Sequence, residues 1–190
     1  MYTDLESAQR EILAFVSDPD RCVLALRMRP ETVELALRMV AGMDQRGALG
    51  GPCVAGPAEA EDAESLVGYL HAGIERHFAS LQKRPRDVLF APRGAELAVP
   101  RVESSTAVGA VSLVEQAAER LAYVASRLIV VVTVDDTTPE PVRLALHDFA
   151  CLLRHSRTRL LVLDGTTSGL LSPETTSLAR AAVVDVSPAE

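Results

Sequence analysis

Short apolar segments alternate along the chain with longer segments whose apolar residues recur at helical spacing. The apolar segments cover residues 22–26, 53–55, 128–134, 159–163 and 182–186. The expected helices cover about 4–16, 30–43, 60–81, 111–127 and 139–155. Continuous apolar runs are typical of strands buried on both faces of a sheet. Strands of this kind that alternate with amphipathic helices predict an α/β fold of three layers, with a mostly parallel central sheet and helices on both faces.

The length of 190 residues suits one domain with a core of its own. No internal repeat, low-complexity tract or linker divides the chain. We therefore expect a single α/β domain over residues 1–190, in which 1–20 form an N-terminal helix and turn and 21–187 form the sheet core. Residues 87–91 are a further candidate strand, and 92–106 are expected to form an irregular loop.

Charge and composition exclude several classes of function. The net charge of −7 argues against nucleic acid as the main partner, because binding the phosphate backbone needs a basic surface. No apolar run approaches the ~20 residues of a membrane span, and the first residues do not resemble an export signal. The cysteines, which are few and widely spaced, are typical of reduced thiols. These features predict a cytoplasmic protein that does not act at a membrane.

Candidate site residues follow the strands. Ligands of open parallel sheets bind beyond the carboxyl ends of the strands, and those ends carry Arg27, the pair Asp135 and Asp136, and Asp164. The three carboxylates could hold Mg²⁺, a cation that prefers oxygen ligands. The alternative is structural: Asp136, Thr137 or Thr138 could cap the following helix, and Asp164 could hold a tight turn.

The segment from Val131 to Asp136, an apolar run followed by two acids, is similar to the magnesium-side motif of P-loop NTPases. The order of elements over most of residues 20–187 resembles the core of ATPases of the STAND and AAA type. This resemblance implies a P-loop-like sheet. It also implies that a phosphate-binding GxxxxGKS/T loop should follow the first strand.

The chain departs from that motif at the matching place, where it reads Arg27-Met28-Arg29-Pro30-Glu31-Thr32-Val33. This segment has no glycine and no lysine. Pro30 lacks an amide donor, and Glu31 would place a negative charge near phosphate. Lys83, which is the only lysine, follows a different helix. Together with this departure, the resemblance implies a domain that has lost its phosphate-binding half, a pseudo-NTPase.

The expected helix over 139–155 carries two patterned faces. Its inward face is predicted to hold Val142, Leu146, Phe149 and Leu153. On the other side, His147, Cys151 and His155 recur every four residues. The first and last of these lie about 12 Å apart along a straight helix, which is too far for one metal ion, so no metal site is assigned. Leu144 makes the second face partly apolar, and we expect Leu144, His147, Cys151 and His155 to form a surface that a partner covers.

The sequence is therefore compatible with three functions. The first is a catalytically inactive, P-loop-like module for protein interaction or regulation in a bacterial signalling or defence system, without a cofactor. The second is a small Mg²⁺-dependent phosphoryl-transfer or hydrolytic enzyme that uses Asp135, Asp136 and Asp164, with Arg27 or Arg29 on an anion, where a magnesium-bound nucleotide is the implied ligand. The third is a structural subunit of a larger assembly. Each of these three functions is compatible with a homo-oligomer.

Overall fold

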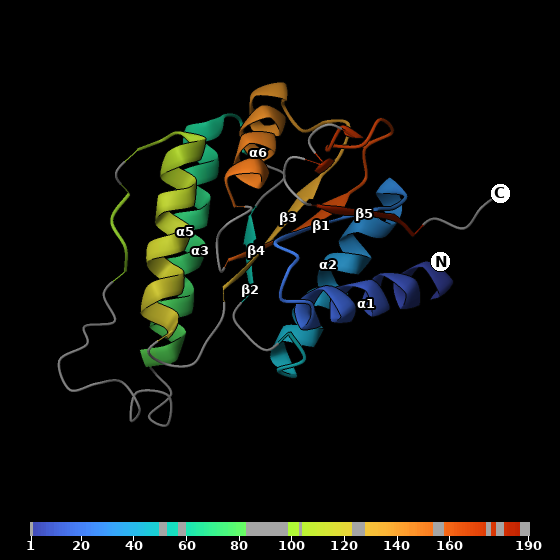
Figure 1. The fold of residues 1–190 in the computed structure, drawn as a ribbon, viewed down its shortest axis with the longest axis horizontal. Helices are drawn as coiled ribbons and strands as arrows, with labels where there is room; N and C mark the ends of the chain where they lie inside the picture. The colour runs from blue at the N-terminus through green and yellow to red at the C-terminus, as the bar shows by residue number, and fades with distance from the viewer. Residues whose placement is uncertain are drawn as a thin grey trace.

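A computed structural model describes residues 2–49, 53–56, 60–82, 99–102, 104–122, 128–153, 158–173, 176–177 and 181–186. Its helices are α1 (Tyr2–Ser17), α2 (Pro30–Gln45), α3 (Ala63–Gln82), α5 (Ala107–Ala122) and α6 (Glu140–Leu152). Its strands are β1 (Val23–Arg27), β2 (Cys53–Gly56), β3 (Ile129–Val134), β4 (Arg159–Asp164) and β5 (Ala182–Asp185). All five strands pair in parallel, in the order β2-β3-β4-β1-β5 (Figure 1).

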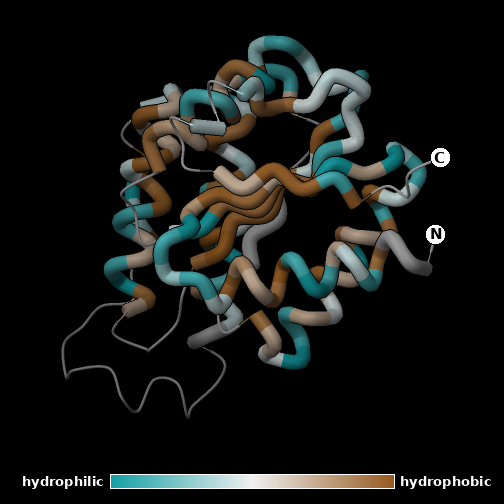
Figure 2. The backbone as a smooth tube through the Cα atoms, turned by 45° about the vertical axis from the view of Figure 1, so that its right-hand side comes forward, coloured by the Kyte–Doolittle hydropathy of each residue, from teal (hydrophilic) through white to brown (hydrophobic). Residues whose placement is uncertain are grey.

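The sheet separates two apolar cores. Alternate residues of β1 face opposite sides: Leu24 and Leu26 pack with α1 and α2, and Val23 and Ala25 pack with α3, α5 and α6. Figure 2 shows the apolar strands between the two helical layers. Both faces of the central strands are covered, which explains their unbroken apolar runs. The predicted three-layer α/β fold is confirmed.

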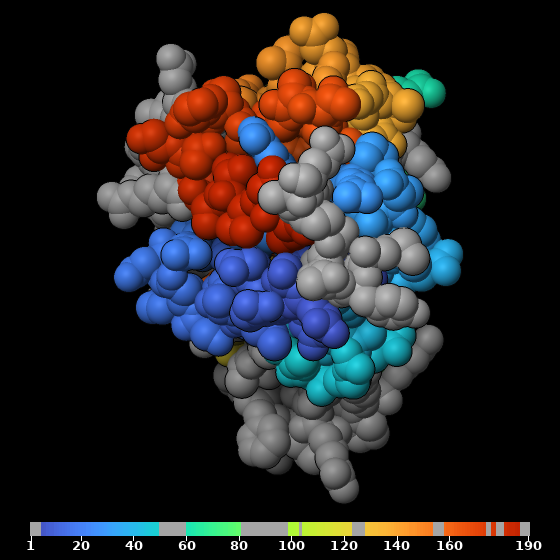
Figure 3. Space-filling view, turned by 90° about the vertical axis from the view of Figure 1, so that its right-hand side faces the viewer, coloured from blue at the N-terminus to red at the C-terminus, as the bar shows by residue number. Residues whose placement is uncertain are grey.

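A buried arginine fixes α1 to the sheet. Arg159, at the start of β4, donates a hydrogen bond from Nη1 to the Phe15 carbonyl, and its guanidinium lies 5.5 Å from the centroid of the Phe15 ring. Phe15 is in the last turn of α1, where the helix dipole favours a cation. The N-terminal helix therefore packs into the fold, and Figure 3 shows it in dark blue beneath the orange and red C-terminal third.

The strand order places a topological switch point between β1 and β4, where sheets of this class have a crevice at their carboxyl edge. The chain leaves β1 through α2 on one face, and it leaves β4 along the opposite face, where Leu171 joins the core beneath α3, α5 and α6. Sheets of this class bind ligands at such a switch point. The carboxyl ends of β1 and β4 are therefore the place to look for a site.

The elements expected from the sequence are present wherever the structure describes them. The candidate strand at 87–91 lies outside the described residues, as does most of the expected loop at 92–106. The described residues of that loop, 99–102 and 104–106, form neither helix nor strand. Among the described helices, none combines the length and the apolar character that crossing a membrane requires.

Gly109, in the first turn of α5, packs directly against the backbone of Ser104. A Cβ at position 109 would overlap the Ser104 carbonyl oxygen and lie 2.6 Å from its carbon. We expect Gly109→Ala to lower the free energy of unfolding by about 2–3 kcal/mol, measured by urea titration. Gly68→Ala in α3 is the matched control, because no atom lies within 4 Å of its added Cβ. The control should gain about 0.5–1 kcal/mol, and equal stability of the two variants would contradict this packing.

Candidate functional site at the carboxyl edge of the sheet

The strand pairing brings the predicted site residues together. Arg27 of β1 pairs in register with Asp164 of β4, and Asp164 pairs on its other side with Val134 of β3. Asp135 follows Val134 directly, so its strand end is next to that of Asp164. The strand ends that carry Arg27, Asp135 and Asp164 are therefore neighbours. The hydrogen bonds of each carboxylate decide what that neighbourhood can do.

Asp135 holds the turn that follows β3. Its Oδ1 accepts hydrogen bonds from the backbone N of Thr137 at 2.9 Å and of Thr138 at 3.0 Å. The same oxygen accepts both threonine hydroxyls, at 2.6 Å and 3.2 Å. These bonds, led by that from the Thr137 hydroxyl, hold the pKa of Asp135 below its usual value. Asp135 is thus a charged acceptor for its own turn.

Asp164, the last residue of β4, holds the turn that follows this strand, and unlike Asp135 it is buried. Its residue surface is 1% exposed. Oδ1 accepts the backbone N and the hydroxyl of Thr166 at 3.0 Å and 2.6 Å, and Oδ2 accepts the backbone N of Leu170 at 2.7 Å. Both oxygens are therefore used to fold residues 165–170 back over the sheet.

Asp136 joins the two turns. Its side chain is exposed, and Oδ1 accepts the backbone N of Thr167 at 3.0 Å and the Thr167 hydroxyl at 3.2 Å. The bond spans 31 positions in the chain. It ties the connection after β3 to the connection after β4.

Thr166 and Thr167 were not identified from the sequence, and Thr137 and Thr138 were considered as caps of the following helix, although all four carry a signal. The same pattern, Asp-x-Thr-Thr, follows two strands: once from Asp135 to Thr138, and once from Asp164 to Thr167. An aspartate followed by threonines favours such side-chain to backbone turns. The expected cap of α6 by Asp136, Thr137 or Thr138 is wrong, because Pro139 occupies the N-cap position without a side-chain hydrogen bond.

The crevice between β1 and β4 is filled by the chain itself. Only Met28 and Arg29 separate β1 from α2, which leaves no loop to wrap around a phosphate. The first turn of α2 packs on Gly165: a Cβ there would lie 3.2 Å from Pro30 Cα and 2.8 Å from Val33 Cγ2.

The donors and charges at the start of α2 are also unsuited to a phosphate. The Thr32 amide already donates to the Arg29 carbonyl at 2.8 Å. Pro30 supplies no amide, and Glu31 places an acid in the first turn.

The predicted cations lie at the rim of this crevice. Arg29 is exposed, whereas Arg27 is partly buried. The Arg27 guanidinium lies against Gly169, whose φ of 79° favours glycine and whose missing Cβ leaves room for the arginine. The Nε atom of Arg27 is buried and has no hydrogen-bond partner among the described residues. In the register of the sheet, residue Arg27 lies between Asp164 of β4 and Asp185 of β5.

This arrangement is better suited to holding turns than to holding a ligand. Both oxygens of Asp164, and Oδ1 of Asp135 and of Asp136, accept hydrogen bonds from backbone amides and threonine hydroxyls of the two connections. Within the part of the chain that the structure describes, no three His, Cys, Asp or Glu side chains are grouped so that they could hold a metal ion. The four-residue spacing on α6 likewise produces no such group among its described members.

The outer face of α6 is a second candidate site. Its inward residues Val142, Leu146, Phe149 and Leu153 are buried as predicted. Of the predicted partner surface, Leu144 is exposed, His147 and Cys151 are partly exposed, and His155 lies outside the described residues. Cys151 also packs against the core beneath α6.

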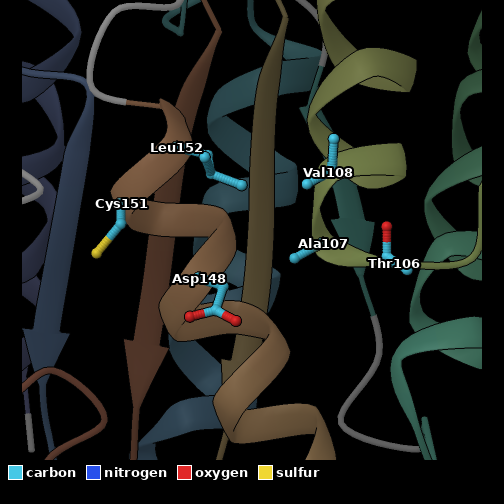
Figure 4. A pocket seen from close by; sticks show the side chains of 6 residues that line it. All are labelled: Thr106, Ala107, Val108, Asp148, Cys151 and Leu152. Carbon is cyan, nitrogen blue, oxygen red and sulfur yellow. The ribbon is translucent and has the colours of Figure 1, made fainter.

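A groove of about 350 Å³ lies between α6 and the start of α5 (Figure 4). Its lining consists of Thr106, Ala107, Val108, Asp148, Cys151 and Leu152. Three large apolar side chains are exposed on these two helices: Val108 at 64%, Leu144 at 59% and Leu152 at 44%. Val108 and Leu152 both line the groove, and exposed apolar groups that lie together mark binding surfaces more often than scattered ones do.

Replacing the buried carboxylate tests its structural role. Asp164→Asn would turn an amide donor toward the donors of Thr166 or Leu170, and we expect a loss of about 2–3 kcal/mol in the free energy of unfolding. The matched control is Asp136→Asn, whose exposed position should limit the loss to about 1 kcal/mol or less. Urea titrations with and without Mg²⁺ measure both. Stabilisation of the wild type by Mg²⁺ that Asp164→Asn abolishes would contradict the turn-holding role.

Comparison of the chain with protein-family models and with curated protein sequences finds no match. Its function is therefore inferred from two features of its own geometry. The carboxyl edge of the sheet is closed by contacts within the chain, and the outer face of α5 and α6 carries three exposed apolar side chains.

Proposed function

We propose that the chain is a catalytically inactive, P-loop-like domain that acts as a protein-interaction or regulatory module in a bacterial signalling or defence system. The exposed apolar surface formed by Val108, Leu144 and Leu152 carries the proposal, because solvent-exposed groups of this size on neighbouring helices gain free energy when a partner covers them. The placement of such a module in a signalling or defence system rests on the resemblance to STAND and AAA ATPases.

The strand order supports the proposal that the domain has a P-loop-like sheet. The order β2-β3-β4-β1-β5 is neither the 3-2-1-4-5-6 of dinucleotide-binding sheets nor the 2-1-3-4-5 of flavodoxin-like sheets. It places β1 in the interior of the sheet, with the connection to α2 beside the end of β4. The connection that binds phosphate in P-loop proteins would occupy this position.

The residues between β1 and α2 support the proposal that the domain is catalytically inactive. A phosphate cradle needs several free amides and room for the backbone to approach the ligand. Here the connection is two residues long, and Pro30 and Val33 pack on Gly165. A nucleotide phosphate could enter only if α2 moved away from the end of β4.

Two other functions receive less support. The hypothesis of a Mg²⁺-dependent enzyme is supported by the pairing of β3 with β4, which brings Asp135 near Asp164. The hypothesis of an enzyme is weakened because these carboxylates already accept hydrogen bonds from Thr137, Thr138 and Thr166. A structural subunit of a larger assembly would use the same apolar surface, and it differs from the proposal in having a permanent partner.

The proposal predicts that Leu144 is needed for partner binding and not for folding. Leu144→Asp should reduce capture of a protein partner from a lysate of the source cells by about ten-fold or more. Its melting temperature should stay within about 2 °C of wild type, since surface substitutions change stability little. Leu13→Asp on α1 is the matched control, a leucine that is 39% exposed on the opposite side of the sheet. Equal capture by the two variants, or unfolding of Leu144→Asp alone, would contradict the proposal.

A further inference from the structure

The exposed residues of α6 form a stripe with a charge at its centre. Leu144, Asp148 and Leu152 follow one another at intervals of four, so they lie on one face of the helix. The two leucines are about 12 Å apart along the axis, or two helical turns. The side chain of Asp148 is 66% exposed between them.

The start of α5 widens this stripe into a groove. In Figure 4, Leu152 from α6 and Val108 from α5 extend toward the same gap, and Asp148 lies one turn earlier on α6. Ala107 contributes a small side chain from α5, which leaves space between the helices. The groove thus has apolar walls and runs beside the stripe, a shape that suits an amphipathic helix laid along α6.

Charge indicates what kind of helix this is. Asp148 is the one charged group among the described residues that line the groove. Its Oδ1 lies 3.5 Å from Nδ1 of the neighbouring His147. The Thr106 hydroxyl accepts the Gly109 amide at 3.4 Å, so one of the first amides of α5 is already capped. The whole chain carries a net charge of −7, which attracts basic partners and repels acidic ones.

A second copy of this chain does not match these charges. If two copies of α6 packed antiparallel about a two-fold axis, Leu144 of one would meet Leu152 of the other. The same axis would then place the two Asp148 carboxylates against each other. Both copies would also carry the same net charge.

We propose that the groove between α5 and α6 binds an amphipathic helix of a partner protein, with two apolar side chains on Leu144 and Leu152 and a lysine or arginine between them facing Asp148. This inference rests on the proposed function, because it names the chemistry of the partner that the interaction module binds. A lysine or arginine stem also covers apolar surface while its charge reaches the carboxylate.

Two synthetic peptides test the inference. Each is a helical peptide of about 18 residues that carries two leucines eight positions apart. The residue midway between the leucines is lysine in the first peptide and glutamate in the second. Fluorescence anisotropy with the full chain measures both dissociation constants at low salt. We expect the lysine peptide to bind about ten-fold more tightly than the glutamate peptide.

Matched variants of the protein complete the test. Asp148→Lys should reverse the preference between the two peptides, and Leu144→Asp should abolish binding of both. The melting temperature of each variant should stay within about 2 °C of wild type. Equal affinities for the two peptides in the wild type would overturn the role of Asp148. Absence of binding by either peptide would overturn the helix-in-groove inference.

Two further outcomes separate this inference from the proposed function. If neither peptide binds and lysate capture still depends on Leu144, the interaction module stands and its partner is not a helix of this chemistry. If light scattering shows a dimer that Leu144→Asp dissociates, the groove is occupied by a second copy and the inference is overturned. If capture does not depend on Leu144, the proposed function fails as well.

Discussion

The contact between the first turn of α2 and the backbone of Gly165 is the constraint on which the carboxyl edge of the sheet depends. It places Pro30 and Val33 in the crevice between β1 and β4, where sheets of this class bind ligands. A side chain at position 165 would push α2 away from the end of β4. With glycine there, the two connections leave the sheet on opposite faces and still touch at its edge.

The aspartates after β3 and β4 complete this closure. Asp135 and Asp164 each fix the turn that follows their own strand, and Asp136 joins one turn to the other through Thr167. Carboxylates that accept several short hydrogen bonds are strongly held, because hydrogen bonds to a charged acceptor are stronger than those to a neutral one. The residues that would carry chemistry in a P-loop-like enzyme therefore act here as supports for the edge. The exposed apolar surface of α5 and α6 is then the feature best placed for function.

Much of this fold could be predicted from the sequence, because apolar strands and amphipathic helices alternate with clear periods. The apolar runs over 22–26, 128–134 and 159–163 predicted the strands, and Arg27, Asp135 and Asp164 follow these runs directly. Two things could not be predicted in this way. The hydrogen bonds that Thr167 donates to Asp136 depend on which strands are neighbours, and hydropathy does not determine strand order. The exposure of Leu152 depends on where α5 begins relative to α6, which a helical pattern in one segment does not specify.

The most direct test of the account is a calorimetric titration of the purified protein with ATP and with GTP, each with and without Mg²⁺. The account predicts no heat of binding in any of the four titrations, because the first turn of α2 fills the place of the phosphates. Micromolar binding that Asp135→Ala abolishes would contradict it. That result would mean that α2 moves away from Gly165 and that the strand-end aspartates serve a nucleotide.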